Sequence, residues 1–348
     1  MMQLVMIASF LVLLCGLFDS IAAVNNDSNT TTSSNINWSS ISDFFFPPNS
    51  CVHGVKSVSL VLFTSNIPNG QVVEVNKSCN LFDPSKPVIF LSNGYRSNAT
   101  AYNFSVLAST LIKKDYTVFS IDWANASCRN DPTTLNRPTY PFAAINSRIV
   151  GEVYLASFIK SVIDVCGVPM RNITLMGHCL GAHISGFAAK KLYTMGYDKP
   201  PLLIGADPIA LPFEIVDCSN RFCKTDAKRV IALHTSVFGI QRSIADLDLW
   251  FNDGPVQPGC GMSDLTNLLP RCSHYRAIDY VILLNNYSFV GVRTTYRLVR
   301  NPFLPFLESL GCFSNKTDLI VDDEIFNGNK TGDYCISVSS EYPYYTTS

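Results

Sequence analysis

The sharpest chemical pattern in the sequence is the pentapeptide Gly177-His178-Cys179-Leu180-Gly181. It follows an apolar run at 173–176 and precedes a helical pattern that begins at Ala182. A strand, a tight turn and a helix in this order form a nucleophile elbow, in which two glycines let the turn close and the central side chain is exposed above the sheet. The N-terminus of the following helix favours an anion at that point. Serine is usual at the central position, and this sequence has Cys179 there.

A nucleophile of this kind needs a general base, and the sequence contains five histidines. We interpret His178 and His183 as structural, because side chains in the elbow cannot turn back to the neighbouring thiol. His53 lies next to the N-terminal segment, and His234 ends a predicted strand and fits a hydrogen-bonded core residue. His274 follows the predicted strands and opens a helix. It therefore comes last in the chain, as the histidine does in the order nucleophile, acid, histidine. We predict His274 as the base, with a purely structural histidine as the alternative.

The acid of such a site holds the histidine ring and stabilises its charged form. Asp207 ends the apolar run that follows the elbow helix, so we predict this role for it. The alternative is an ordinary turn aspartate before proline, a common arrangement.

An oxyanion hole needs two backbone N–H groups. We expect one from Leu180, directly after the nucleophile position. The second is expected from the loop 92–96 that follows the apolar run 87–91, at Tyr95. Because these donors belong to the backbone, changes of side chain in the loop need not remove them.

The elements that must position these residues alternate along the chain. Apolar runs with strand character occur at 58–63, 87–91, 116–122, 173–176, 202–204 and 230–233. Helical periodicity occurs at 143–165, 182–194 and 274–284. Strands that alternate with helices predict a mostly parallel central sheet with helices on both faces, the α/β-hydrolase fold. Short strands and turns are expected from about residue 287. We predict one domain over 51–348.

The N-terminal region indicates secretion. An apolar run at 4–18 followed by Ser20 and Ala22 predicts a signal peptide over 1–23, and the run is too short for a transmembrane segment. Residues 24–50 are rich in Asn, Ser and Thr and predict a disordered, glycosylated segment. Eleven Asn-x-Ser/Thr sequons support an extracellular location; they begin at Asn26, Asn29, Asn37, Asn76, Asn98, Asn103, Asn125, Asn172, Asn286, Asn315 and Asn329.

The net charge and the cysteine content limit which partners and which cellular compartment fit the sequence. The net charge of −1 gives no reason to expect a nucleic-acid partner. Of the twelve cysteines, eleven remain after removal of Cys15 with the signal peptide. In an oxidising compartment an odd number implies at least one free thiol.

Taken together, these segments resemble the pancreatic-lipase family, and within it the insect phospholipases A1 of the kind found in wasp venoms. The matching segments are 177–183, 205–208, 225–227, 233–235, 257–260 and 272–274. The resemblance implies a carboxylic-ester hydrolase that acts on lipids or phospholipids at a lipid interface. It also implies a short lid over 261–271, with an apolar stripe that faces either lipid or the core; the stripe comprises Met262, Leu265, Leu268 and Leu269.

The resemblance implies most of the disulfide pairs as well. The expected pairs are Cys51–Cys128, Cys218–Cys223, Cys260–Cys272 and Cys312–Cys335, and the remaining Cys79 and Cys166 are expected to join each other. Cys179 is then the unpaired thiol, as a nucleophile position requires.

The sequence departs from the family pattern around the predicted site. Cys179 replaces the nucleophile serine, Asn93-Gly94 replaces a His-Gly pair in the oxyanion loop, and Ala206 replaces the leucine before the acid. Cys223 stands where the family has an aspartate of a calcium site, so we expect no metal, and nothing in the sequence implies a cofactor. Changes gathered in one place are what relaxed selection on catalysis produces.

Three functions therefore stay open. The first is a phospholipase A1-like ester hydrolase with Cys179, His274 and Asp207 as catalytic residues, weakened because thiolate leaves more easily than alkoxide and sulfur is larger than oxygen. The second is a catalytically inactive lipase homologue that binds lipid or a protein partner. The third is a thiol redox sensor. The rate at which Cys179 is alkylated distinguishes an activated thiolate from an inert thiol.

Overall fold

The computed structural model describes residues 50–129, 139–261, 264, 272–294, 298–300, 308–310 and 319–344. All of them lie in the unit that spans Phe46–Ser348. The predicted signal peptide and most of the predicted glycosylated segment lie outside the described residues.

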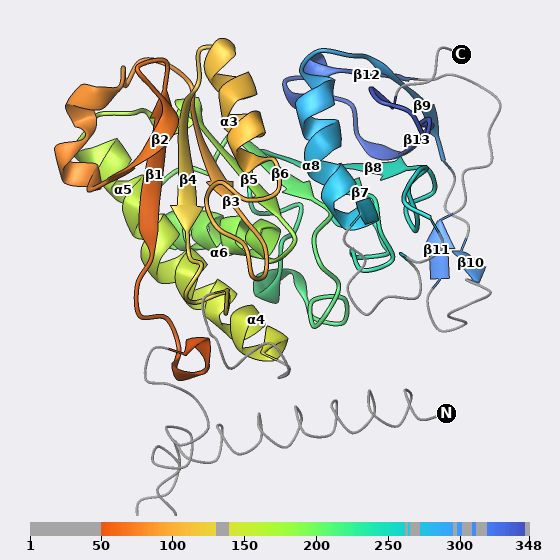
Figure 1. Cartoon of the computed structure of the whole chain (residues 1–348), viewed down its shortest axis with the longest axis horizontal. Coiled ribbons are helices and arrows are strands. Elements are labelled where there is room, and N and C mark those ends of the chain that lie inside the picture. Colours follow the sequence, from red (N-terminus) through yellow and green to blue (C-terminus); the bar gives the residue numbers. More distant parts are fainter. Residues whose placement is uncertain are drawn as a thin grey trace, which may run out of the picture. The chain divides into compact units, whose positions relative to one another are not determined.

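One large twisted sheet forms the centre of the described unit (Figure 1). The strands are β1 (Ser59–Thr64), β2 (Ile67–Val73), β3 (Val88–Ser92), β4 (Thr117–Asp122), β5 (Ile173–His178), β6 (Leu202–Ala206), β7 (Arg229–His234), β8 (Leu247–Phe251), β9 (Phe289–Arg293), β10 (Leu298–Arg300), β11 (Glu308–Leu310), β12 (Leu319–Val321) and β13 (Gly332–Ile336). The main sheet has 11 strands in the order β12-β9-β13-β8-β7-β6-β5-β3-β4-β1-β2. The neighbours from β4 to β13 pair in parallel, and antiparallel strands flank them on both sides. Strands β10 and β11 pair separately.

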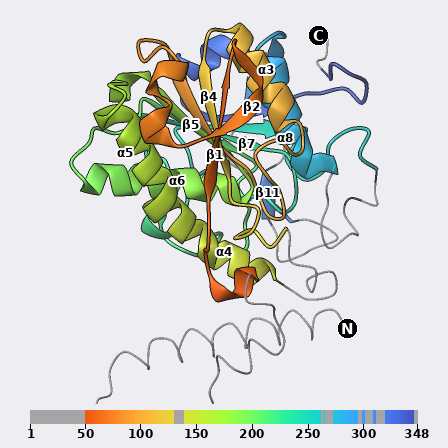
Figure 2. The same cartoon turned by 60° about the vertical axis from the view of Figure 1, so that its left-hand side comes forward.

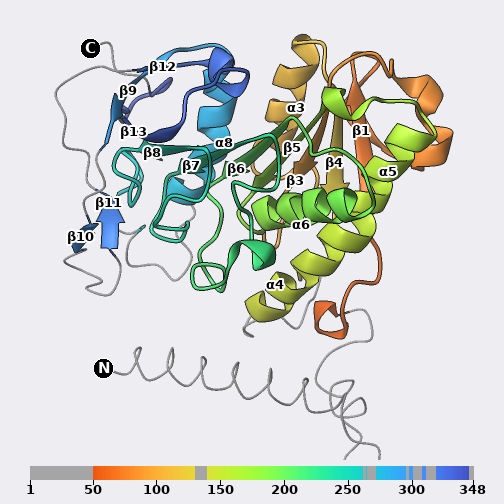
Figure 3. The ribbon, with the colours of Figure 1, turned by 180° about the vertical axis from the view of Figure 1, so that it is seen from behind.

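Helices cover both faces of this sheet. They are α3 (Phe104–Lys113), α4 (Tyr140–Ile149), α5 (Ala156–Asp164), α6 (Leu180–Thr194) and α8 (Cys272–Leu284), with a π-helical segment η5 (Val150–Leu155) and the short 3-10 turns η1 (Cys51–His53), η2 (Val75–Lys77), η3 (Cys79–Leu81), η6 (Met170–Asn172), η7 (Cys218–Asn220) and η8 (Asp323–Phe326). Figure 2 shows the strands between a layer of α4, α5 and α6 and a layer of α3 and α8, and Figure 3 shows the first layer from its own side.

The strand sequences produce these two layers because successive side chains of a strand point to opposite faces. In β3, Val88 and Phe90 belong to the core beneath α6, whereas Ile89 and Leu91 belong to the core beneath α3 and α8. Because such a strand is buried on both faces, its sequence is a continuous apolar run, which is typical of parallel sheets. The predicted fold class is confirmed.

Segments α4, η5 and α5 form one continuous helix, Tyr140–Asp164, which packs on the elbow helix α6. Within the described residues it is long and apolar enough to cross a membrane by length and composition, but half of its most apolar window is buried inside the protein. Gly151 permits the close crossing, because a β-carbon there would lie 2.5 Å from the carbonyl oxygen of Ile184 in α6.

Each of the six predicted strands and three predicted helices has a counterpart in the structure. Among the described strands and α-helices before residue 287, β2, β8 and α3 were not expected. Short strands are present from residue 289, as expected, and three of them, β9, β12 and β13, extend the main sheet beside β8.

Four predicted disulfides are present: Cys51–Cys128, Cys79–Cys166, Cys218–Cys223 and Cys260–Cys272. Cys335 is disulfide-bonded, and its predicted partner Cys312 lies outside the described residues. Cys179 is the free cysteine of the described part of the chain, and it is buried.

Candidate active site

The turn between β5 and α6 holds Cys179 in a strained backbone conformation. Its φ is 59° and its ψ is −125°, a region that residues with a side chain rarely adopt and that is typical of functional sites. The two elbow glycines make this turn possible. A β-carbon on Gly177 would lie 2.0 Å from the carbonyl oxygen of Gly181, and one on Gly181 would lie 2.0 Å from that of Ser92. No other residue fits at either position.

Asp207 follows β6 directly and is fully buried. Its Oδ1 accepts hydrogen bonds from the backbone N–H groups of Thr235 (2.9 Å) and Ser236 (3.3 Å). Its Oδ2 accepts a bond from the Ser236 hydroxyl at 2.5 Å. The backbone at Gly239 approaches so closely that a β-carbon there would lie 2.3 Å from Oδ1. The loop after β7 thus encloses the carboxylate.

His274 lies in the first turn of α8, and its Nδ1 donates to Oδ2 of Asp207 at 2.6 Å. Asp264 stabilises this helix start, because its carboxylate accepts from the N–H groups of Cys272 and Ser273 at 3.3 and 2.7 Å. Burial alone would lower the pKa of His274, but the charge of the nearby Cys179, together with the hydrogen bond and the charge of Asp207, raises it to about 10. The Nε2 atom of His274 is buried and has no hydrogen-bond partner among the described residues.

His178 and His183, both interpreted as structural, use their rings to connect segments. Burial lowers the pKa of His178 well below its usual value, so its neutral ring donates from Nε2 to the carbonyl oxygen of His274 at 3.0 Å. The elbow therefore holds the backbone of the predicted base. Burial lowers the pKa of His183 to about 3; its Nε2 contacts the carbonyl oxygen of Ile209 and its Nδ1 accepts from the N–H of Phe222.

His234 anchors the loop that surrounds Asp207. Its Nδ1 lies 2.9 Å from the carbonyl oxygen of Ile240, and its Nε2 lies 2.8 Å from Oδ1 of Asp248. The ring stacks on Trp250 with centroids 3.8 Å apart. Ser236, two residues further on, was not expected from the sequence. A serine after a strand carries no signal of its own, and only its contact with Asp207 singles it out.

The predicted oxyanion loop follows β3. The side chain of Asn93 donates to the carbonyl oxygen of Ile121 at 2.9 Å, and the backbone carbonyl oxygen of Asn93 accepts from the indole N–H of Trp123 at 3.0 Å. Gly94 lies directly against Cys179. The hydroxyl of Tyr95 is hydrogen-bonded to that of Thr139 at 2.8 Å. Leu180, the other predicted oxyanion residue, begins α6.

The predicted lid residues Met262, Leu265, Leu268 and Leu269 lie outside the described residues. The Cys260–Cys272 disulfide closes the segment that contains them.

Cys223, which stands where the family resemblance places a calcium-binding aspartate, forms a disulfide. Cys223 is bonded to Cys218, and the nearby Asp226 pairs with Lys190 at 2.6 Å. Within the described residues, no group of three or more His, Cys, Asp or Glu side chains is arranged to hold a metal ion.

Known proteins of one family resemble this chain over most of its length. The family model described as Lipase matches residues 49–297. A phospholipase A1 from Dinoponera quadriceps is 41% identical over 285 residues, which cover 80% of this chain and 72% of the relative. A phospholipase A1 from Vespa crabro is 35% identical over 305 residues, which cover 85% of this chain and 97% of the relative. A solved alpha/beta hydrolase enzyme from a Medee basin deep-sea metagenome library is 15% identical with a TM-score of 0.30, over 51% of this chain and 64% of that chain. The family model extends over most of this chain, and both phospholipases match most of it, so the chain belongs to the lipase family.

Proposed function

We propose that the chain is a secreted, phospholipase A1-like carboxylic-ester hydrolase that acts on lipid esters, with Cys179 as its nucleophile. The observation that carries the proposal is the 2.6 Å contact between Nδ1 of His274 and Oδ2 of Asp207, next to the elbow whose turn holds Cys179. Nucleophile, base and acid follow one another in the chain in the order of α/β-hydrolases. The relatives named phospholipase A1 support phospholipid as the substrate class.

In the proposed reaction, Nε2 of His274 takes the thiol proton of Cys179 while the sulfur attacks the ester carbonyl carbon. The N–H groups of Leu180 and Tyr95 stabilise the oxyanion. Collapse of this intermediate transfers the proton from His274 to the departing alcohol and leaves an acyl thioester on Cys179. Water then gives a proton to His274 and attacks the thioester carbon. The carbon–sulfur bond breaks, His274 returns the proton to the Cys179 sulfur, and the fatty acid is released. Asp207 holds the ring and stabilises its positive charge.

We expect this activity to be weaker than that of a serine lipase. A thiolate leaves the tetrahedral intermediate more easily than an alkoxide, so the intermediate from an ordinary ester tends to return to substrate. Sulfur is also larger, and a small misplacement in a preorganised site costs on the order of 100-fold. Activated esters, whose leaving groups depart readily, are expected to react faster than lipid esters.

One observation favours a second candidate, a catalytically inactive lipase homologue that binds lipid or a protein partner. Nε2 of His274, the atom that must take the thiol proton, makes no hydrogen bond to Cys179 or to any other described residue. A thiol that does not donate to the base lacks the activation that nucleophilic catalysis needs. The buried site is then kept for binding alone.

Secretion is the proposed location. The four described disulfides suit an oxidising compartment, and the predicted signal peptide provides the route.

The decisive experiment compares the wild-type secreted protein with Cys179→Ser and Cys179→Ala on phosphatidylcholine and on a nitrophenyl ester. Hydrolysis by the wild type that is lost in Cys179→Ala establishes the cysteine as a working nucleophile. A silent wild type with an active Cys179→Ser variant means that the frame is competent and that the thiol blocks turnover. Silence of both the wild type and Cys179→Ser would refute the enzyme proposal and leave the binding function.

A further inference from the structure

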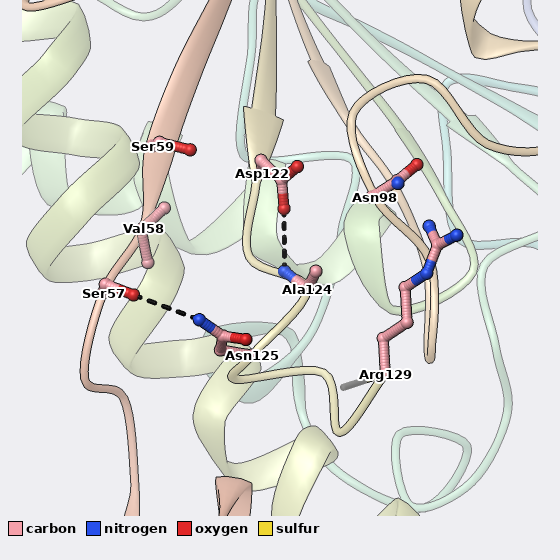
Figure 4. Close-up of a pocket in the computed structure, with 8 residues that line it drawn as sticks. All are labelled: Ser57, Val58, Ser59, Asn98, Asp122, Ala124, Asn125 and Arg129. Carbon is pink, nitrogen blue, oxygen red and sulfur yellow. Dashed lines mark hydrogen bonds between the residues drawn. The ribbon is translucent and has the colours of Figure 1, made fainter. Parts of the chain in front are cut away.

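Two of the sequon asparagines, far apart in the sequence, line the same pocket. Asn98 lies in the segment after the predicted oxyanion loop, and Asn125 lies in the turn after β4. Both face a cavity of about 410 Å³ whose other polar lining residues are Ser57, Ser59, Asp122 and Arg129. Figure 4 shows Asn98 and Arg129 on one side of this pocket and Ser57 and Asn125 on the other, with Asp122 between them.

The two amides differ in which atom is engaged. The Oδ1 of Asn98 accepts from the N–H of Thr100 at 3.2 Å and from its hydroxyl at 3.4 Å. The hydrogen bonds of Asn98 within the described part of the chain use this oxygen and not the amide nitrogen. In Asn125 it is the nitrogen that is engaged, because it donates to the Ser57 hydroxyl at 3.4 Å. The amide nitrogen is the atom that carries the sugar of an N-linked glycan, so the fold accommodates a glycan on Asn98 without losing a hydrogen bond, whereas one on Asn125 would disturb its bond to Ser57.

The pocket lining suits a sugar. It offers a carboxylate at Asp122, a guanidinium at Arg129, and hydroxyls at Ser57 and Ser59, so it contains both donors and acceptors for the hydroxyl and acetamido groups of N-acetylglucosamine. Oδ1 of Asp122 is already bonded to the N–H of Ala124 at 3.0 Å, which fixes the carboxylate in place. We propose that Asn98 carries an N-linked glycan whose first sugars lie in this pocket.

The modification uses a lipid-linked oligosaccharide diphosphate as donor. A bond forms between Nδ2 of Asn98 and C1 of N-acetylglucosamine, the bond from C1 to the diphosphate oxygen breaks, and the amide loses one proton to the departing diphosphate. The modified amide keeps its second N–H, and its carbonyl oxygen keeps the contact with Thr100.

A glycan in this pocket would join two segments that border the predicted active site. The N–H of Arg96 donates to the carbonyl oxygen of Ser127 at 3.1 Å, and the Ser127 hydroxyl lies 3.4 Å from the carbonyl oxygen of Ser97. The Cys51–Cys128 disulfide also anchors the segment that contains Ser127. Sugars held between Asn98 and Arg129 therefore add contacts to the segment that follows Tyr95.

The first test is site-by-site glycopeptide mass spectrometry of the chain secreted from insect cells. We expect Asn98 to be occupied in the wild type and in Thr100→Ser, and unoccupied in Thr100→Ala, which keeps the asparagine but removes the sequon. An unmodified Asn98, or a glycan at Asn125 in its place, would overturn the assignment.

The second test asks whether the sugars lie in the pocket. Peptide N-glycosidase applied to the native protein in ¹⁸O-water marks each released site. Release at Asn98 should be slow in the native protein and complete after denaturation, whereas occupied sequons at the exposed Asn76 or Asn286 are released in both states. Arg129→Ala should speed native release at Asn98 about tenfold, the equivalent of one lost hydrogen bond, and leave the exposed sites unchanged. Equal native release at Asn98 and the exposed sites would show that the sugars lie outside the pocket.

Discussion

Gly94 and Cys179 are in direct contact: a β-carbon on Gly94 would lie 2.7 Å from Cβ of Cys179 and 3.2 Å from its Sγ. The predicted oxyanion loop and the predicted nucleophile thus touch at a position where only glycine fits. This contact brings the backbone of the loop next to the nucleophile position, which an oxyanion hole requires.

Gly94→Ala should therefore impair reactions at Cys179 strongly. The added methyl group must displace the loop or the thiol, and a displacement of about 1 Å in a preorganised site costs on the order of 100-fold in rate. The effect is measured as hydrolysis of a nitrophenyl ester, with Gly94→Ala introduced into the wild type or, if only that variant is active, into Cys179→Ser. Unchanged rates would mean that the loop has no part in the reaction.

Ser236 should act on the site through Asp207, because its hydroxyl donates to the same Oδ2 that accepts from His274. Ser236→Ala should lower the rate of Cys179 alkylation about tenfold, the equivalent of one hydrogen bond to a charged group. In an Asp207→Asn background the same substitution should have little further effect. Additive losses, or a fall in the unfolding temperature that accounts for the lower rate, would contradict this positioning role.

The charge state of His274 should make stability depend on pH. Burial alone lowers the pKa of His274, but Cys179 and Asp207 raise it to about 10, above the ordinary 6.5, so the folded protein binds the proton more tightly than the unfolded chain. The stabilisation is complete below pH 6.5 and is lost as the pH rises through about 10. Urea unfolding of wild type and His274→Gln across this range should show a shrinking difference in the free energy of unfolding. A difference that grows with pH would mean that the folded pKa is not raised.

Gly151→Ala should destabilise the fold, although alanine is the better helix former by about 1 kcal/mol. The new β-carbon would lie 2.5 Å from the carbonyl oxygen of Ile184, and overpacking of this kind costs roughly 1–3 kcal/mol. Backbone atoms cannot move aside like the end of a flexible side chain, so the clash outweighs the propensity. Ser157→Ala on the exposed side of the same helix is the control and should change the unfolding midpoint little.

Prediction from the sequence succeeded where the information is local. Apolar runs that are buried on both faces identify parallel strands without knowledge of their partners, so β1 and β3 to β7 were predicted. Strand β2 was missed because it is largely exposed at the edge and includes Pro68 and Gly70. Helix α3 was missed although its apolar residues Phe104, Leu107 and Leu111 follow helical spacing.

The candidate site divides in the same way. The elbow from Gly177 to Gly181 is one short segment, so the sequence alone determined its turn, its glycines and the cysteine at its centre. The bonds of Ser236 to Asp207 and of His178 to the backbone of His274 depend on how β5, β6 and β7 lie side by side and on where α8 begins. The meeting of Asn98 and Asn125 at one pocket likewise depends on the pairing of β3 with β4. Those contacts join residues that are distant in the chain, and only the packing of the sheet decides which of them come within hydrogen-bond distance.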